Sequence, residues 1–318
     1  MFAPPISYFP RFRAHLLKMH FYASLLLLLF SCSSPVVDTA NIKALIEQGE
    51  LSQAETLINE ALTNDSSNLE INLLLADVLL KKGDYKKAYF TLQNARNADS
   101  TNVEVNLKLS QFHLFLARFQ EAISSANDVL KIEKSNAQAY FLKGMSYKGI
   151  GDTAKAYSSF QTTIEQDANY YDAFIQLGIL ASARHDSLAV YYFDNALSLK
   201  ANSPEALYNK ALFFQQHGAL NRAFNTYITI AEGSNFYGSA MFNCGSILYE
   251  QGKYPSALKF FNIASQYNSY KAFYMKGLIY EQQNKRDSAL TEYQKCLDIK
   301  SDYALAQERL NAKGLKKK

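Results

Sequence analysis

Alanine recurs every 32 to 34 residues through most of the chain and marks the centre of a repeated pattern of apolar, small and polar positions. The eight positions are Ala54, Ala88, Ala122, Ala156, Ala189, Ala223, Ala257 and Ala289. Self-similarity at a period of this size is typical of a solenoid, in which each repeat is one supersecondary unit stacked on its neighbours. The pattern therefore predicts a repeat architecture for most of the chain.

Three further rows of residues accompany the alanines. A small residue lies about twelve positions before each repeated alanine: Ala76, Ser110, Gly144, Gly178, Ala211, Gly245 and Gly277, with Ile42 as the exception. A turn former lies about five before: Gly49, Gly83, Gly151, Gly218, Gly252 and Asn284, with Ala117 and His185 as departures. A bulky residue lies four after: Ile58, Leu92, Phe160, Phe193, Tyr227, Phe261 and Tyr293, with Ala126 as the exception. Spacings of three, four and seven on either side of a turn predict two packed helices per repeat.

These residues resemble the tetratricopeptide repeat family, most closely at Tyr140 to Tyr147 followed by Ala156 and Phe160. The resemblance implies an all-α fold: a right-handed α-solenoid of about eight helix-turn-helix units with a C-terminal capping helix. We place the array at residues 37–303 and the cap and basic tail at 304–318. The units are about 35–68, 69–102, 103–136, 137–170, 171–203, 204–237, 238–269 and 270–303.

The N-terminus differs from the array. Residues 1–31 contain Arg11, Arg13 and Lys18 but no acidic residue, and an apolar run from 21 to 30 precedes Cys32. The run is too short to span a bilayer, but it matches the core of a signal peptide. The junction resembles a bacterial lipobox, which implies a lipid on Cys32, a tether at 32–36 and a place in the bacterial cell envelope, with the outer membrane favoured. The alternative is an ordinary secretory signal that leaves Cys32 without a role.

Net charge and composition limit the classes of partner that the chain is suited to bind. The formal net charge is +4, and removal of the three basic residues in 1–31 would lower it to +1. Without a basic excess, nucleic-acid binding has no electrostatic footprint. The chain is 48% hydrophobic, and no low-complexity linker divides the array. We therefore expect one elongated domain.

The sequence offers little for catalysis. Its five histidines and three cysteines have no metal-ligand spacing, and phosphate-binding or nucleophile motifs are absent. Carboxylate pairs such as Glu121 and Asp128 are commonplace on helix surfaces. We expect Cys244 and Cys296 to be buried, free thiols that pack as small hydrophobic groups. The sequence predicts a protein that is not an enzyme and has no metal or cofactor.

The family resemblance implies that first helices line a concave groove with the fifth position of each unit. That row is Thr39, Leu73, Leu107, Phe141, Ile175, Tyr208, Phe242 and Tyr274. Met145 lies one turn further along its helix, and Gln176, Asn209 and Asn243 occupy the sixth position of successive units, where amides can bond a peptide backbone. The candidate peptide-binding residues are Phe141, Met145, Ile175, Gln176, Tyr208, Asn209, Phe242, Asn243 and Tyr274. Alternatively, these residues are only the family consensus.

Together these features favour a membrane-anchored scaffold that binds partner proteins or peptides in its groove. It resembles the bacterial repeat lipoproteins that assist envelope assembly or secretion. Two alternatives remain: an envelope protein that binds a glycan or another small ligand on the aromatic wall, and a non-catalytic accessory subunit of an enzyme complex.

Overall fold

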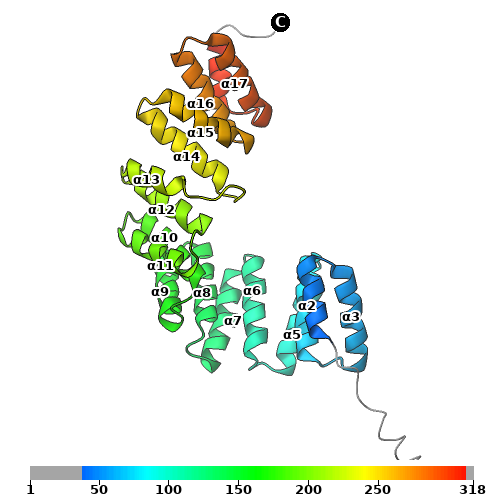
Figure 1. Ribbon diagram of the computed structural model, residues 1–318. Coiled ribbons are helices and arrows are strands. Elements are labelled where there is room, and N and C mark those ends of the chain that lie inside the picture. Colours follow the sequence, from blue (N-terminus) through cyan, green and yellow to red (C-terminus); the bar gives the residue numbers. More distant parts are fainter. Residues whose placement is uncertain (1–37, 313–318) are drawn as a thin grey trace, which may run out of the picture. The chain divides into compact units, whose positions relative to one another are not determined.

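The computed structural model describes residues 38–312, and its seventeen helices follow one another without a strand in that range (Figure 1). The proposed signal peptide, Cys32, the tether and the terminal lysines lie outside the described residues. The first helices of the repeats are α2 (Thr39–Gln48), α4 (Leu69–Lys81), α6 (Val103–Phe115), α8 (Ala137–Ile150), α10 (Tyr171–Ala183), α12 (Pro204–Gln216), α14 (Tyr237–Glu250) and α16 (Tyr270–Gln282). The second helices are α3 (Leu51–Asn64), α5 (Tyr85–Ala98), α7 (Phe119–Ile132), α9 (Thr153–Gln166), α11 (Leu188–Leu199), α13 (Leu220–Tyr227), α15 (Tyr254–Gln266) and α17 (Arg286–Ile299).

Contacts within the chain group the helices into two units. Unit 1 ends at Leu109 and unit 2 begins at Ser110, so the division falls inside α6. Nothing in the sequence marks this point, and each unit is described by itself below. The single elongated domain expected over 37–303 stays a prediction.

The turns inside the hairpins have the predicted left-handed conformation. Gly49, at φ 82°, donates its backbone N–H to carbonyls of the preceding turn of α2. The two departures from the glycine row adopt the same conformation, because Ala117 and His185 both have φ 55°. The turn geometry is therefore kept even where the residue is unfavourable for it.

The small and bulky rows meet inside the hairpins that have a glycine in the small row, as the spacing predicts. The Cβ of an alanine at Gly144 would lie 2.5 Å from the Phe160 ring, and one at Gly277 would lie 2.4 Å from the Tyr293 ring. Gly178 and Gly245 have the same relation to Phe193 and Phe261. Because an added methyl group has no room, the glycine sets how closely the two helices approach.

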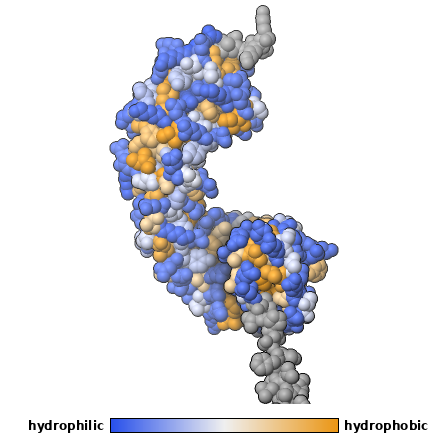
Figure 2. Space-filling model, turned by 45° about the vertical axis from the view of Figure 1, so that its right-hand side comes forward, coloured by the Kyte–Doolittle hydropathy of each residue, from blue (hydrophilic) through white to orange (hydrophobic). Residues whose placement is uncertain are grey.

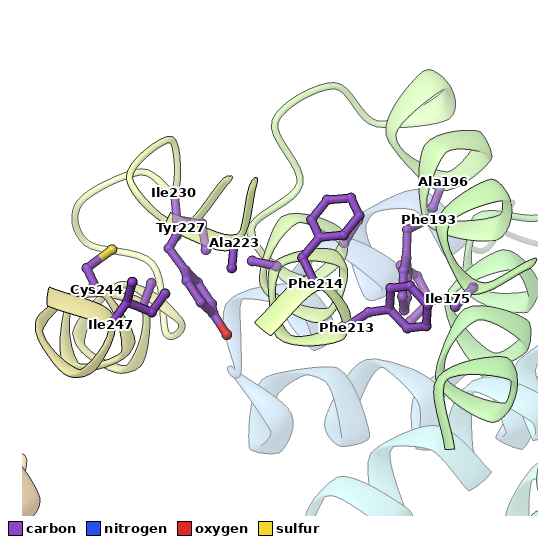
Figure 3. Packing of buried hydrophobic residues seen from close by; sticks show 14 of the residues in the cluster. Ile175, Phe193, Ala196, Phe213, Phe214, Ala223, Tyr227, Ile230, Cys244 and Ile247 are labelled. Carbon is purple, nitrogen blue, oxygen red and sulfur yellow. The ribbon is translucent and has the colours of Figure 1, made fainter. Parts of the chain in front are cut away.

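The two units have cores of different composition. The unit 1 core is aliphatic and contains Ile42, Ile46, Ile58 and Ile71. The largest unit 2 cluster is rich in rings, and Figure 3 shows Phe193 and Phe213 packed beside Ile175, with Tyr227 near Ile247. In the view of Figure 2, exposed hydrophobic residues form separate patches on a mostly hydrophilic surface. The stacking of apolar helix faces accounts for both cores.

The last described helix, α18 (Ala304–Ala312), packs on the end of unit 2. Ala306 is fully buried there, and Arg309 forms an ion pair of 3.4 Å with Glu281 of α16. A helix therefore follows the eighth hairpin where the sequence analysis places a cap.

Candidate functional site

The fifth position of the first helices forms an aromatic row in unit 2. Four of its rings each contact the bulky residue of the second helix in the same hairpin, nineteen positions later. The pairs are Phe141–Phe160, Tyr208–Tyr227, Phe242–Phe261 and Tyr274–Tyr293, with centroid distances of 5.5, 5.6, 5.7 and 5.7 Å. Tilted pairs at these distances are favourable for aromatic rings.

Three of the four rings are also covered on a second side. The covering ring belongs to the residue that immediately precedes the next first helix or the cap helix α18. The pairs are Phe141–Tyr170 at 4.9 Å, Tyr208–Phe236 at 5.3 Å and Tyr274–Tyr303 at 5.4 Å. Burial raises the pKa of Tyr170 to about 12, as expected for a phenol held in such a stack. At the equivalent position after Phe242 the chain has Ser269.

A pocket of about 660 Å³ lies beside Phe242. Tyr208 of α12, Phe242 and Asn243 of α14, and the segments 233–235 and 267–271 contribute to its lining. Figure 1 places α12, α14, α15 and α16 in succession along this part of the chain. The pocket therefore joins three predicted groove residues from two neighbouring repeats.

A shortened helix supplies one wall. α13 ends at Tyr227 after 8 residues, whereas the neighbouring α15 has 13. The residues after it turn at Gly233, at φ 84°, and Ile230 is buried, which holds the loop on the core. The other wall depends on Gly238, because a Cβ there would lie 2.6 Å from the Cβ of Tyr267.

The polar groups of the pocket are arranged around Asn243. Its side-chain amide donates to the Tyr227 hydroxyl at 2.9 Å, and that hydroxyl donates to Gln215 at 3.0 Å. Burial, followed by the nearby Tyr208, raises the pKa of Tyr227, so the hydroxyl stays protonated and can donate. The amide of Asn243 is therefore fixed in place at the pocket wall.

The lining contains no aspartate or glutamate, and Lys271 is its one charged residue. Lys271 is exposed and lies over the face of Tyr270, with its Nζ 6.0 Å from the ring centre. α14 and α16 both begin at the pocket, and the partial positive charge of their N-termini reinforces the positive charge of Lys271. The site is electrostatically suited to a negatively charged or hydrogen-bond-accepting group.

The remaining candidate residues lie elsewhere in unit 2. Ile175 is 1% exposed and packs near Phe193 and Phe213, so it offers no surface to a partner (Figure 3). Tyr274 is 9% exposed beneath Tyr303. Phe141 and Met145 are partly buried against the core on α8. None of these side chains lines the pocket.

The other two amides of the predicted row have partners within the protein. The Gln176 carbonyl oxygen accepts from Lys148 Nζ at 2.6 Å, and the Asn209 amide donates to the Glu205 backbone carbonyl at 2.9 Å. Of the three amides, Asn243 alone lines the pocket. Sequence reasoning missed the loop 233–235 and the turn 267–269, although serine at a position where other repeats have rings was a visible signal.

Groups with catalytic potential are few. Within residues 38–312, no cluster of three or more His, Cys, Asp or Glu side chains could hold a metal ion. Cys244 and Cys296 are free and buried, as predicted, and burial raises their thiol pKa to about 12 and about 11. Both thiols are therefore protonated and unreactive at neutral pH.

Comparison with known families supports the repeat assignment. Tetratricopeptide repeat models match residues 45–100, and also 137–170 and 270–303. The last two segments have the bounds given above for the fourth and eighth units. No curated protein matches the chain significantly.

Solved structures with the same fold come from several bacteria. The C-terminal part of a repeat-containing protein from Cytophaga hutchinsonii is 13% identical, covers 74% of this chain and 98% of its own, and gives a TM-score of 0.60. A tetratricopeptide repeat protein from Parabacteroides merdae is 17% identical with coverages of 76% and 97% and a TM-score of 0.53. PilF of Pseudomonas aeruginosa is 16% identical with coverages of 78% and 98% and a TM-score of 0.53. These likenesses show an all-α solenoid fold.

That fold supports a role as an interaction scaffold for protein or peptide partners, and proteins built from it are generally non-catalytic. Among residues 38–312, no helix combines the length and apolar character needed to cross a membrane.

Proposed function

Because the chain is a tetratricopeptide repeat protein, we propose that it is a membrane-anchored scaffold that holds a partner protein against the first-helix face of unit 2. One observation carries the binding part of this proposal: the pocket beside Phe242, where aromatic walls, a fixed amide and one lysine come together. A few convergent polar groups on an aromatic wall are typical of binding sites. We propose a role in cell-envelope assembly or secretion.

The anchor rests on the sequence. Cys32 follows a basic segment and an apolar run, and α2 begins at Thr39. The six residues between them reach at most roughly 20 Å when extended. A lipid on Cys32 would therefore keep unit 1 close to the membrane surface. One acyl chain binds only reversibly, so the several chains of a lipoprotein anchor suit a permanent location.

A photo-crosslinking experiment in cells tests the binding part. Benzoylphenylalanine replaces Ser239, an exposed pocket residue, or Asn262, an exposed residue of α15 that does not line the pocket. We expect protein adducts from position 239 and none from the control position. Equal adducts at both positions, or none at position 239, would argue against a partner on this face.

Metabolic labelling with palmitate tests the anchor. The wild-type chain should incorporate the label and fractionate with membranes, and Cys32→Ser should lose both properties. Cys296→Ser is the matched control, because that thiol is buried and should not carry a lipid. Label that persists in Cys32→Ser would refute the anchor.

A glycan ligand is the alternative that the pocket also suggests, since Tyr267 is 41% exposed at its edge and can stack on a sugar. A thermal-shift screen of the full chain against a glycan panel addresses it. Stabilisation by a glycan, together with no protein adduct at position 239, would favour this alternative.

A further inference from the structure

We infer that the pocket beside Phe242 receives an aromatic side chain of the partner protein, with an acidic residue of the same segment placed against Lys271. The aromatic side chain takes the position that Tyr170, Phe236 and Tyr303 fill in other repeats of unit 2. The inference rests on the proposed function, because it assumes a protein partner, and it adds the chemistry that the partner must present.

The second face of Phe242 lacks a covering ring because of the residue at the N-cap of the following helix. Tyr170 and Phe236 are the N-cap residues of α10 and α14, and neither helix has a side-chain cap. Their rings cover Phe141 and Tyr208 instead. At α16 the N-cap is Ser269, whose hydroxyl accepts from the Ala272 backbone N–H at 3.3 Å. A serine at this position gives α16 a polar N-cap, but it provides no ring to cover the second face of Phe242.

Neighbouring tyrosines do not close the gap. Tyr267 pairs with Tyr237 at 5.4 Å, and Tyr270 pairs with Tyr303 at 5.1 Å. In the described part of the chain, Phe242 has a ring contact only with Phe261. One face of Phe242 therefore borders the pocket, and the pocket volume of about 660 Å³ exceeds what one ring needs. An incoming ring can stack there as in the three complete sites.

The charge of the pocket selects the flanking residue. No carboxylate lines it, and Lys271 forms no ion pair with the residues that the structure describes. α14 begins without a side-chain cap, and its Gly238 and Ser239 are part of the lining. A carboxylate next to the incoming ring meets the lysine and the positive helix end together. The expected motif is an aromatic residue beside aspartate or glutamate.

Selection from a random peptide library displayed on phage, against the full chain in detergent micelles, tests this inference. We expect enrichment of peptides with an aromatic residue next to an acidic one. Enriched peptides that lack aromatic residues would overturn the inference, and so would the absence of any enrichment.

Two variants then locate the binding of a selected peptide. Ser269→Tyr places a ring at the N-cap as in α10, which fills the vacancy from within. We expect its affinity for the peptide to fall about tenfold or more, equivalent to about 1.4 kcal/mol. Asn68→Tyr is the matched control, because it makes the same change at the N-cap of α4 in unit 1, which does not line the pocket, and its affinity should stay unchanged.

Lys271→Glu separates charge from ring recognition. It should weaken the binding of peptides with a flanking acidic residue and leave the binding of peptides without one unchanged. The thermal unfolding of each variant shows that it is folded. Unchanged affinity in Ser269→Tyr refutes the aromatic slot, even if position 239 still crosslinks to a partner in cells. The scaffold proposal fails separately, through the absence of that crosslink.

Discussion

Units 1 and 2 are built from the same hairpin, yet their successive first helices are joined by different chemistry. In unit 1, Lys43 of α2 pairs with Glu70 of α4 at 2.7 Å, and Asp77 of α4 pairs with Lys108 of α6 at 2.5 Å. In unit 2, ring contacts such as Phe141–Tyr170 also pass from repeat to repeat, beside a polar contact of Lys148 in α8 with Gln176 in α10.

The difference shows what each type of contact can specify. Ion pairs that are fully or partly exposed contribute little to stability, and water replaces a missing partner readily. An aromatic stack excludes water, so a missing ring leaves an opening that a remaining ring borders. The recognition site that we propose therefore lies in unit 2, at the one described stack that is incomplete.

The sharpest test of the comparison is the ion pair that unit 2 buries. Lys276 and Glu292 lie 2.9 Å apart with side chains 8% exposed, whereas Lys43 and Glu70 are 53% and 52% exposed. Lys276→Met should lower the unfolding free energy of the full chain by about 3 kcal/mol, because a buried carboxylate loses a partner. Urea unfolding followed by circular dichroism measures it.

Lys295 keeps one contact with Glu292, at 2.9 Å, which limits the loss. The double variant Lys276→Met, Glu292→Met should recover most of the stability, since two apolar groups replace the pair. A loss below about 1 kcal/mol in the single variant would place the buried pair in the same class as a surface pair.

The second test concerns the small and bulky rows. Gly245→Ala should destabilise unit 2 by about 1–3 kcal/mol, because the new Cβ lies 2.7 Å from the Phe261 ring. Unit 1 has Ala76 and Leu92 at the equivalent positions. Combining Gly245→Ala with Phe261→Leu transplants that pair, and we expect it to restore part of the loss in the same urea experiment. A double variant less stable than either single variant would contradict the idea that the Ala–Leu pair of unit 1 can replace the Gly–Phe pair of unit 2.

The third test uses the turns. Ala117 adopts φ 55° without the freedom of glycine, whereas Gly83 of unit 1 has φ 80°. Ala117→Gly should raise the unfolding free energy by about 1 kcal/mol, because the left-handed conformation costs alanine about that much relative to glycine. Gly83→Ala should lower it by a similar amount. The midpoints of thermal unfolding give both, and equal signs would contradict the interpretation.

The smallest effect is expected at the exposed pair of unit 1. Lys43 lowers the pKa of Glu70 chiefly through the hydrogen bond between their side chains. A lowered carboxyl pKa adds stability above the ordinary value of 4.5 that is lost as the pH falls through the lowered value. Lys43→Met should therefore be slightly less stable than wild type at neutral pH and equal to it in acid. Thermal unfolding at both pH values checks this, and high salt should remove the difference.

The hairpins could be predicted from sequence because their determinants are local and repeated. Gly144 faces Phe160, and Gly277 faces Tyr293, at a constant spacing that one aligned column reveals. Even the left-handed turn at Ala117 follows from its place in that column.

The site could be predicted only in part, because it depends on departures from the repeat. Tyr208, Phe242 and Asn243 were identified as groove residues and do line the pocket. The early end of α13 was not foreseen, since Ile230 keeps the apolar pattern while the backbone leaves the helix. Ile175 has the right position but the wrong surroundings, because the rings of Phe193 and Phe213 enclose it. Such enclosure is a property of neighbouring repeats and is invisible in one column.

Serine and aromatic residues alternate at the helix starts of unit 2, from Tyr170 through Ser203, Phe236 and Ser269 to Tyr303, so the recognition site that we propose would be easy to relocate during evolution. Some serine codons differ from those of phenylalanine and tyrosine by one nucleotide. On our proposal, one such change at Ser269 would close the opening beside Phe242, and the reverse change at Phe236 would uncover Tyr208 in the preceding repeat. Paralogues of a single ancestor could thus present different docking positions without any insertion or deletion.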